Sequence, residues 1–117
     1  MLIFPLKKEW YEKIKSGEKT IEYREVKPYW TKRLWHEGGS LTFDKVSYDF
    51  EAIKDLVIFP MTCFLQLGYN PETRLSAIIN KIEVVDGKNT DLAIDKPVYA
   101  IHLKHVKKIE EKIYGIL

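Results

Sequence analysis

A glycine between an amphipathic helix and a strand is the feature that most constrains how this chain folds. Residues 7–16 predict a helix, because Trp10 and Ile14 recur four residues apart and share one apolar stripe. Gly17 then stands at the C′ position, where only glycine takes the left-handed conformation at little cost. Residues 20–24 include Thr, Ile and Tyr, which favour an extended chain. The chain therefore passes directly from its first helix into a strand.

Alternation along this strand divides its side chains between two faces. Ile21 and Tyr23 form an apolar pair that we expect to face the core, while Glu22 and Arg24 lie on the polar face. Lys19 stands at the turn, so three ionisable groups gather where the helix ends and the strand begins. Such a group is either a surface ion pair, worth at most about 1 kcal/mol, or part of a functional site.

The rest of the chain mixes strand and helix signals. In chain order we expect a strand at 2–6, helices at 7–16 and 28–38, a strand at 20–24, an extended segment with a kink at Pro60 at 56–67, strands at 75–85 and 98–104, and a helix at 104–113. Pro5 predicts that the first strand either lies at a sheet edge or ends at this residue. Residues 41–55 fit either a strand or a turn. The pattern is α+β and mostly antiparallel, and periodicity alone does not choose between a barrel and an open sheet.

The same periodicities predict a core. Within 75–85, Ile78, Ile82 and Val84 are expected on one face of the strand. The predicted core residues are Trp10, Ile14, Ile21, Tyr23, Ile82, Tyr99, Ile101 and Leu103. This core draws on the first helix and on three of the expected strands.

Composition limits the classes of function. At 117 residues with a net charge of +2, the chain is expected to form one domain, 1–117. Nucleic-acid binding by bulk charge needs a more basic chain, so such a function must come from a local patch. The single cysteine, Cys63, has apolar neighbours and predicts a buried, unreactive thiol. No signal sequence or membrane span is predicted, so we expect a soluble cytoplasmic protein.

Three stretches form a recognisable pattern. The first is Lys8-Glu9-Trp10-Tyr11-x-x-Ile14 followed by Gly17-x-Lys19-x-x-Glu22-x-Arg24, the second is 25–34, and the third is Leu67-Gly68-Tyr69 with the strand at 76–84. Together they resemble the ASCH domain family, in its small prokaryotic and phage branch. The resemblance implies a PUA-like fold, a small, mostly antiparallel β-barrel with two N-terminal helices and one C-terminal helix. It also implies recognition of RNA or of modified nucleobases.

On this resemblance, a basic cleft around the Gly17-to-Arg24 motif binds RNA or a nucleoside. Lys and Arg side chains would take phosphates and an aromatic ring would stack on a base. The expected binding residues are Lys7, Lys8, Lys19, Glu22, Tyr23, Arg24, Lys27, Tyr29, Arg33 and Tyr69. The expected basic face consists of Lys7, Lys8, Lys19, Arg24, Lys27 and Arg33.

Catalysis is the alternative, because some ASCH relatives resemble amidohydrolases that act on acylated cytidine and others resemble ribonucleases. Lys19 falls on the lysine of the amidohydrolase branch and is a candidate catalytic residue, together with Glu22. Glu22 stands where that branch has a threonine, so it could activate water as a general base but not act as the same nucleophile. The branch's downstream acidic residue has no clear counterpart here. We therefore favour binding over catalysis.

A third hypothesis is a protein–protein interaction module that uses the aromatic helix at 28–38. Salt discriminates it from nucleic-acid binding, because phosphate contacts weaken as ionic strength rises. No metal or other cofactor is expected. His102 and His105 point to opposite faces of a strand, and the sequence has no phosphate-binding loop.

Overall fold

The computed structural model describes residues 1–38 and 59–109. In chain order the elements are β1 (Ile3–Leu6), α1 (Lys8–Ser16), β2 (Ile21–Glu25), α2 (Pro28–Gly38), β3 (Met61–Leu67), β4 (Leu75–Asp86) and β5 (Pro97–Lys108). Short 3-10 turns at Pro71–Thr73 and Gly87–Asn89 flank β4. Residues 41–55, which the sequence left open, lie outside the described residues.

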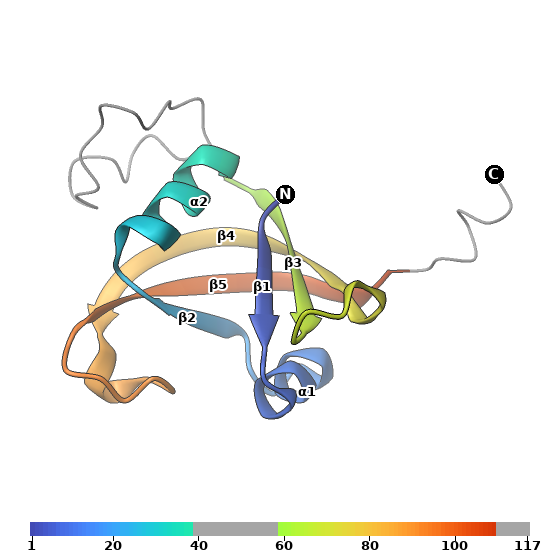
Figure 1. The fold of residues 1–117 in the computed structure, drawn as a ribbon, viewed down its shortest axis with the longest axis horizontal. Coiled ribbons are helices and arrows are strands. Elements are labelled where there is room, and N and C mark those ends of the chain that lie inside the picture. Colours follow the sequence, from blue (N-terminus) through green and yellow to red (C-terminus); the bar gives the residue numbers. More distant parts are fainter. Residues whose placement is uncertain (39–58, 110–117) are drawn as a thin grey trace, which may run out of the picture.

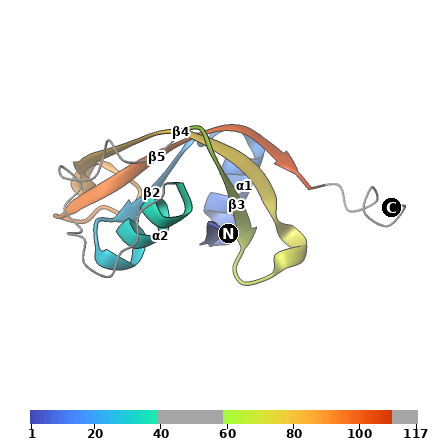
Figure 2. The same cartoon turned by 90° about the horizontal axis from the view of Figure 1, so that it is seen from above.

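The five strands form one sheet in the order β1-β3-β4-β5-β2. β1 runs parallel to β3, and the other neighbouring pairs are antiparallel. The sheet is strongly curved, and both helices lie on its concave side (Figures 1 and 2). A hydrophobic core fills the space between the sheet and the helices, with Ile14 of α1 and Leu34 of α2 fully buried against it.

The sheet does not close into a barrel, so the predicted PUA-like β-barrel is wrong. β1 and β2 are the two edges of an open sheet and do not pair with each other. Pro5 lies in β1 and has no N–H to donate, as the prediction of an edge strand required. In place of backbone pairing, the Arg24 side chain of β2 donates a hydrogen bond to the Pro5 carbonyl oxygen at 2.8 Å. The fold of the described residues is α+β, and its one sheet is mixed and open.

The expected pattern of two N-terminal helices and one C-terminal helix is also wrong. The described residues contain α1 and α2, but the start of the expected helix at 104–113 belongs to β5. β5 keeps its backbone pairing with β4 as far as Lys108, which lies opposite Leu75. Pairing with a neighbouring strand thus overrides the helical spacing of the apolar residues. Neither of the two helices has the length and apolar character that crossing a membrane requires.

A β-bulge explains why one predicted strand face is wrong. The register between β4 and β5 shifts between Ile79 and Lys81, which adds one residue to β4. The shift moves the inward-facing positions from odd to even numbers. Ile79 and Ile82 are therefore both buried, whereas Ile78, which was expected to share a face with Ile82, is only partly buried. Val84 stays on the same face as Ile82 but is 36% exposed near the end of the strand.

The predicted core is confirmed for five of its residues: Ile14, Ile82, Tyr99, Ile101 and Leu103 are buried. Trp10, Ile21 and Tyr23 are only partly buried, so their prediction as core residues is wrong. Trp10 belongs to α1, and Ile21 and Tyr23 belong to β2, which is an edge strand of the sheet. This edge is where the structure departs most from the apolar pattern of the sequence.

Candidate functional site

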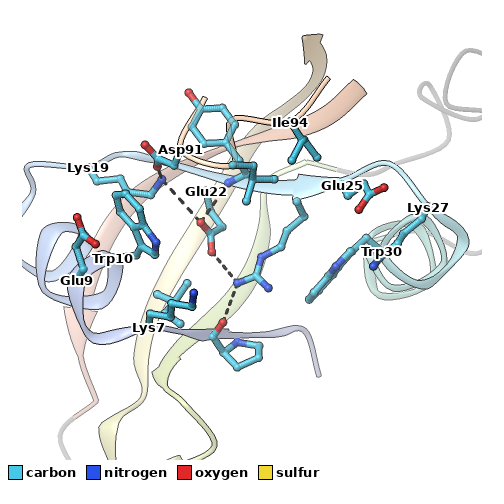
Figure 3. A pocket seen from close by; sticks show the side chains of 15 residues that line it. Lys7, Glu9, Trp10, Lys19, Glu22, Glu25, Lys27, Trp30, Asp91 and Ile94 are labelled. Carbon is cyan, nitrogen blue, oxygen red and sulfur yellow. Dashed lines mark hydrogen bonds and ion pairs between the residues drawn. The ribbon is translucent and has the colours of Figure 1, made fainter. Parts of the chain in front are cut away.

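A cleft of about 610 Å³ opens between the two edges of the sheet. Its lining comes from the β1–α1 junction (Pro5, Leu6, Lys7, Glu9, Trp10), from β2 and the turn before it (Lys19, Glu22, Tyr23, Arg24, Glu25), from α2 and its approach (Lys27, Trp30) and from the β4–β5 loop (Asp91, Leu92, Ile94) (Figure 3). The cleft thus lies between β1 and β2, the two strands that would pair with each other if the sheet were a closed barrel.

A chain of ion pairs crosses this cleft (Figure 3). Asp91 pairs with Lys19, whose Nζ lies 3.9 Å from Oε1 of Glu22. Oε2 of Glu22 accepts a hydrogen bond from Nη2 of Arg24 at 2.8 Å, and the same Nη2 reaches the Pro5 carbonyl. The motif spacing therefore did bring Lys19, Glu22 and Arg24 together, as expected.

Glu22 is the buried side chain of β2, only 5% exposed. The prediction that Ile21 and Tyr23 face the core while Glu22 faces solvent is therefore wrong. Burial of a carboxylate is tolerated when it is paired and hydrogen-bonded. Oε1 accepts a hydrogen bond from the backbone N–H of Tyr23 at 3.1 Å, and Oε2 is held by Arg24. These partners let a charged side chain occupy the inner face.

The Lys19 ammonium group is enclosed by two rings and two carboxylates. Its side chain is 10% exposed, and Nζ lies 5.2 Å from the ring centre of Trp10 and 4.8 Å from that of Tyr23. A cation over an aromatic face is attracted by the ring quadrupole. Burial, and then the charge of Asp91, raises the pKa of the Tyr23 phenol. Trp10 therefore helps to form the site instead of the core.

Arg24 lies close to two aromatic rings. Its Cζ lies 4.7 Å from the ring centre of Trp30 and 5.3 Å from that of Phe4. Its Nε is buried and has no hydrogen-bond partner within the described part of the chain. Trp30 is itself buried, yet one part of it lines the cleft. The guanidinium is therefore held by its contacts with the two rings and by its hydrogen bonds to Glu22 and to the Pro5 carbonyl.

The structure brings six of the ten expected binding residues into the cleft: Lys7, Lys19, Glu22, Tyr23, Arg24 and Lys27. The other four, Lys8, Tyr29, Arg33 and Tyr69, do not line it. Arg33 covers the ring of the exposed Tyr29 at 3.8 Å from its centre, and Tyr69 is 89% exposed in the turn after β3. The expected basic face is thus divided between the cleft and the outside of the helices.

The β4–β5 loop supplies the part of the cleft that the sequence did not predict. Gly87 donates from its N–H to the Lys96 carbonyl at 2.8 Å and accepts from the Ile94 N–H at 3.2 Å, which folds the loop back on itself. Asp91 is thereby placed beside Lys19, 72 residues away in the chain. The Asp86-Gly87 turn signal marks the loop, but no motif marks this contact.

Gly87→Ala tests how strongly this loop is fixed. A Cβ there would lie 2.6 Å from the Lys96 carbonyl oxygen and 2.7 Å from that of Ile94, and backbone atoms cannot move aside cheaply. We expect the free energy of unfolding to fall by about 1–3 kcal/mol, measured by urea denaturation. Asn89→Ala, at an exposed position of the same turn, should stay within about 0.5 kcal/mol of wild type. Equal stability of the two variants would contradict this account.

Among residues 1–38 and 59–109, the histidine, cysteine and acidic side chains outside the cleft form no metal site. No three His, Cys, Asp or Glu side chains there are placed to hold a metal ion. His102 lies 3.0 Å from Glu83, and this hydrogen bond is the main reason why the pKa of Glu83 is lowered. Burial, with the Glu22 charge as a lesser cause, raises the pKa of the Cys63 thiol to about 12. Cys63 is therefore buried and protonated at neutral pH, as predicted.

Comparisons with protein-family models, with curated proteins and with solved structures found no match to this chain. The resemblance to the ASCH domain family therefore stays a prediction from the Gly17-to-Arg24 motif and its flanking stretches. An assignment of function has to depend on the side chains of the cleft.

Proposed function

We propose that the chain binds single-stranded RNA by taking an unpaired base into the cleft. The observation that carries the proposal is the combination of cations, carboxylates and flat rings in one concave site. The cleft volume of about 610 Å³ suits a small ligand group, since such sites measure roughly 300–1,000 Å³. Unpaired RNA bases are recognised by stacking and by hydrogen bonds to their edges, and the cleft offers groups for both.

Arg24 offers a plane on which a base can stack. Its guanidinium is backed by the Trp30 ring and fixed by Glu22, and RNA bases stack on Arg planes as well as on aromatic rings. Each stacked base contributes about 1–3 kcal/mol. The carboxylate of Glu25, on the same strand, suits the exocyclic amino group of a base, because a carboxylate is purely an acceptor.

The charges in the cleft favour base recognition over bulk attraction to phosphate. The basic lining residues are Lys7, Lys19, Arg24 and Lys27, and the acidic ones are Glu9, Glu22, Glu25 and Asp91. Lys19 and Arg24 are engaged with carboxylates inside the cleft. Lys7, before α1, and Lys27, before α2, lie apart in the cleft (Figure 3) and are exposed. Neither forms an ion pair with a described acidic residue, so these two can bind phosphates.

The double variant Lys7→Ala, Lys27→Ala is expected to weaken RNA binding and to flatten its salt dependence. Each phosphate contact on a single strand adds about 0.7 to the slope of log K against log salt. Loss of both lysines should therefore reduce the slope by about 1.4. Fluorescence anisotropy of a labelled, unstructured RNA, titrated between about 50 and 200 mM salt, measures the change.

The matched control is Lys8→Ala, Lys32→Ala, which removes the same charge from the two helices at exposed positions outside the cleft. The control should keep the wild-type slope. An equal loss in both double variants would indicate bulk attraction and contradict binding in the cleft. Wild-type protein that does not bind RNA at any of these salt concentrations would refute the proposal and leave the protein–protein interaction hypothesis standing.

A further inference from the structure

A second cavity, of about 290 Å³, adjoins the cleft. The two cavities share four lining residues, Trp10, Lys19, Tyr23 and Asp91. These four side chains therefore form a partition between two hollows. One base in the cleft would leave the smaller hollow unused.

Lys19 lies at the centre of this partition. Its ammonium pairs with Asp91 and is within 5.2 Å of the ring centres of Trp10 and Tyr23. Lys13, which lines only the second cavity, places its Nζ 5.1 Å from the centre of the Trp10 ring. The partition thus presents a cation flanked by aromatic rings, with an open space on each side. Single-strand sites use the same groups, with aromatic rings for bases and cations for the backbone between them.

We propose that the ligand passes through this partition, with one base in the cleft, the next base in the second cavity and the linking phosphate at Lys19. The inference rests on the proposed function and names its ligand as a dinucleotide step of a single strand. Asp91 lies on a loop, and its side chain is 33% exposed. The phosphate, also an anion, takes the place of Asp91 as the partner of the Lys19 ammonium.

Isothermal titration with each ribonucleoside 5′-monophosphate and its homodinucleotide tests the inference. A second stacked base adds free energy that corresponds to roughly a tenfold gain in affinity. We therefore expect the best dinucleotide to bind about tenfold tighter than its mononucleotide. The charge difference between these ligands is controlled by repeating both titrations at higher salt.

Thr20→Trp locates the gain in the second cavity. Thr20 is exposed and lines the second cavity but not the cleft, so an indole there should fill only the smaller hollow. The variant should keep the mononucleotide affinity and lose the dinucleotide gain. Thr62→Trp, at an exposed position of β3 that lines neither cavity, is the matched control and should keep both affinities. Thermal unfolding checks that both variants fold.

Two results would overturn the second subsite while leaving the proposed function intact. One is a dinucleotide that binds no tighter than the mononucleotide. The other is a full dinucleotide gain in Thr20→Trp. A protein that binds no mononucleotide, dinucleotide or longer RNA would instead refute the proposed function, and the second subsite with it.

Discussion

Glu22→Ala is expected to lower the free energy of unfolding by about 3 kcal/mol, at the low end of the range of roughly 3–5 kcal/mol for removing one member of a buried ion pair. The carboxylate is 7% exposed and Arg24 only 18%, so the variant leaves a largely buried guanidinium without its counter-charge. The backbone N–H of Tyr23 loses its acceptor as well. Lys19 keeps Asp91 and Arg24 keeps the Pro5 carbonyl, which limits the loss.

Urea denaturation of Glu22→Ala beside Lys88→Ala separates a buried network from a surface pair. Lys88 pairs with Asp95, and these side chains are 58% and 83% exposed, so the loss of that pair should cost only about 0–1 kcal/mol. Matching midpoints for the two variants would show that the Glu22 pairs contribute no more than a surface ion pair. The ion pairs of Glu22 with Lys19 and Arg24 would then not be needed for the stability of the fold.

Local signals in the sequence predicted the elements around the cleft. Gly17 takes φ +85° at the end of α1, as the helix–strand break requires. Pro28 begins α2, because its fixed φ suits the first helical position and its missing N–H is not needed there. Pro5 lies on an edge strand for the related reason that it cannot donate to a ladder. Each of these features depends on one residue and its neighbours.

Features that depend on distant partners were not predictable in the same way. The burial of Glu22 depends on its ion pairs with Lys19 and Arg24. Lys19 in turn contacts Asp91, and Arg24 contacts Pro5, and both of these partners are distant in the sequence. The bulge in β4 that turns Ile82 inward is set by its register against β5. Openness of the sheet depends in the same way on which strands become its edges.

The geometry of Glu22 also bears on the hydrolase hypothesis. A general base needs an oxygen within about 2.6–3.2 Å of the water that it deprotonates. Both oxygens of Glu22 already have partners, Oε1 the Tyr23 N–H and Oε2 the Arg24 guanidinium. A carboxylate held in this way is suited to fixing Arg24 and Lys19 in place. Binding is therefore the function that this arrangement supports better.

Glu22→Gln distinguishes hydrolysis from binding as the function of the cleft, because the two predict very different turnover. The amide keeps the shape of the side chain and one acceptor oxygen but removes the negative charge. If Glu22 activates water, turnover of acetylated cytidine or of a short RNA should fall by about 10²–10⁴-fold, with ligand affinity retained. If the cleft only binds, neither protein should hydrolyse either substrate, and RNA affinity should hold or rise because one acidic group in the cleft is gone. We expect the second result.

The comparison is made on protein that unfolding curves show to be folded, since loss of the charge weakens the network that holds Arg24. Turnover by the wild type that disappears in Glu22→Gln would replace binding with catalysis as the function of the cleft. Turnover that is equal in the two proteins would assign the chemistry to another group. Binding by both proteins without turnover would show that Glu22 is not a general base, and that the acceptor oxygen which Gln keeps is enough to hold Arg24 in place.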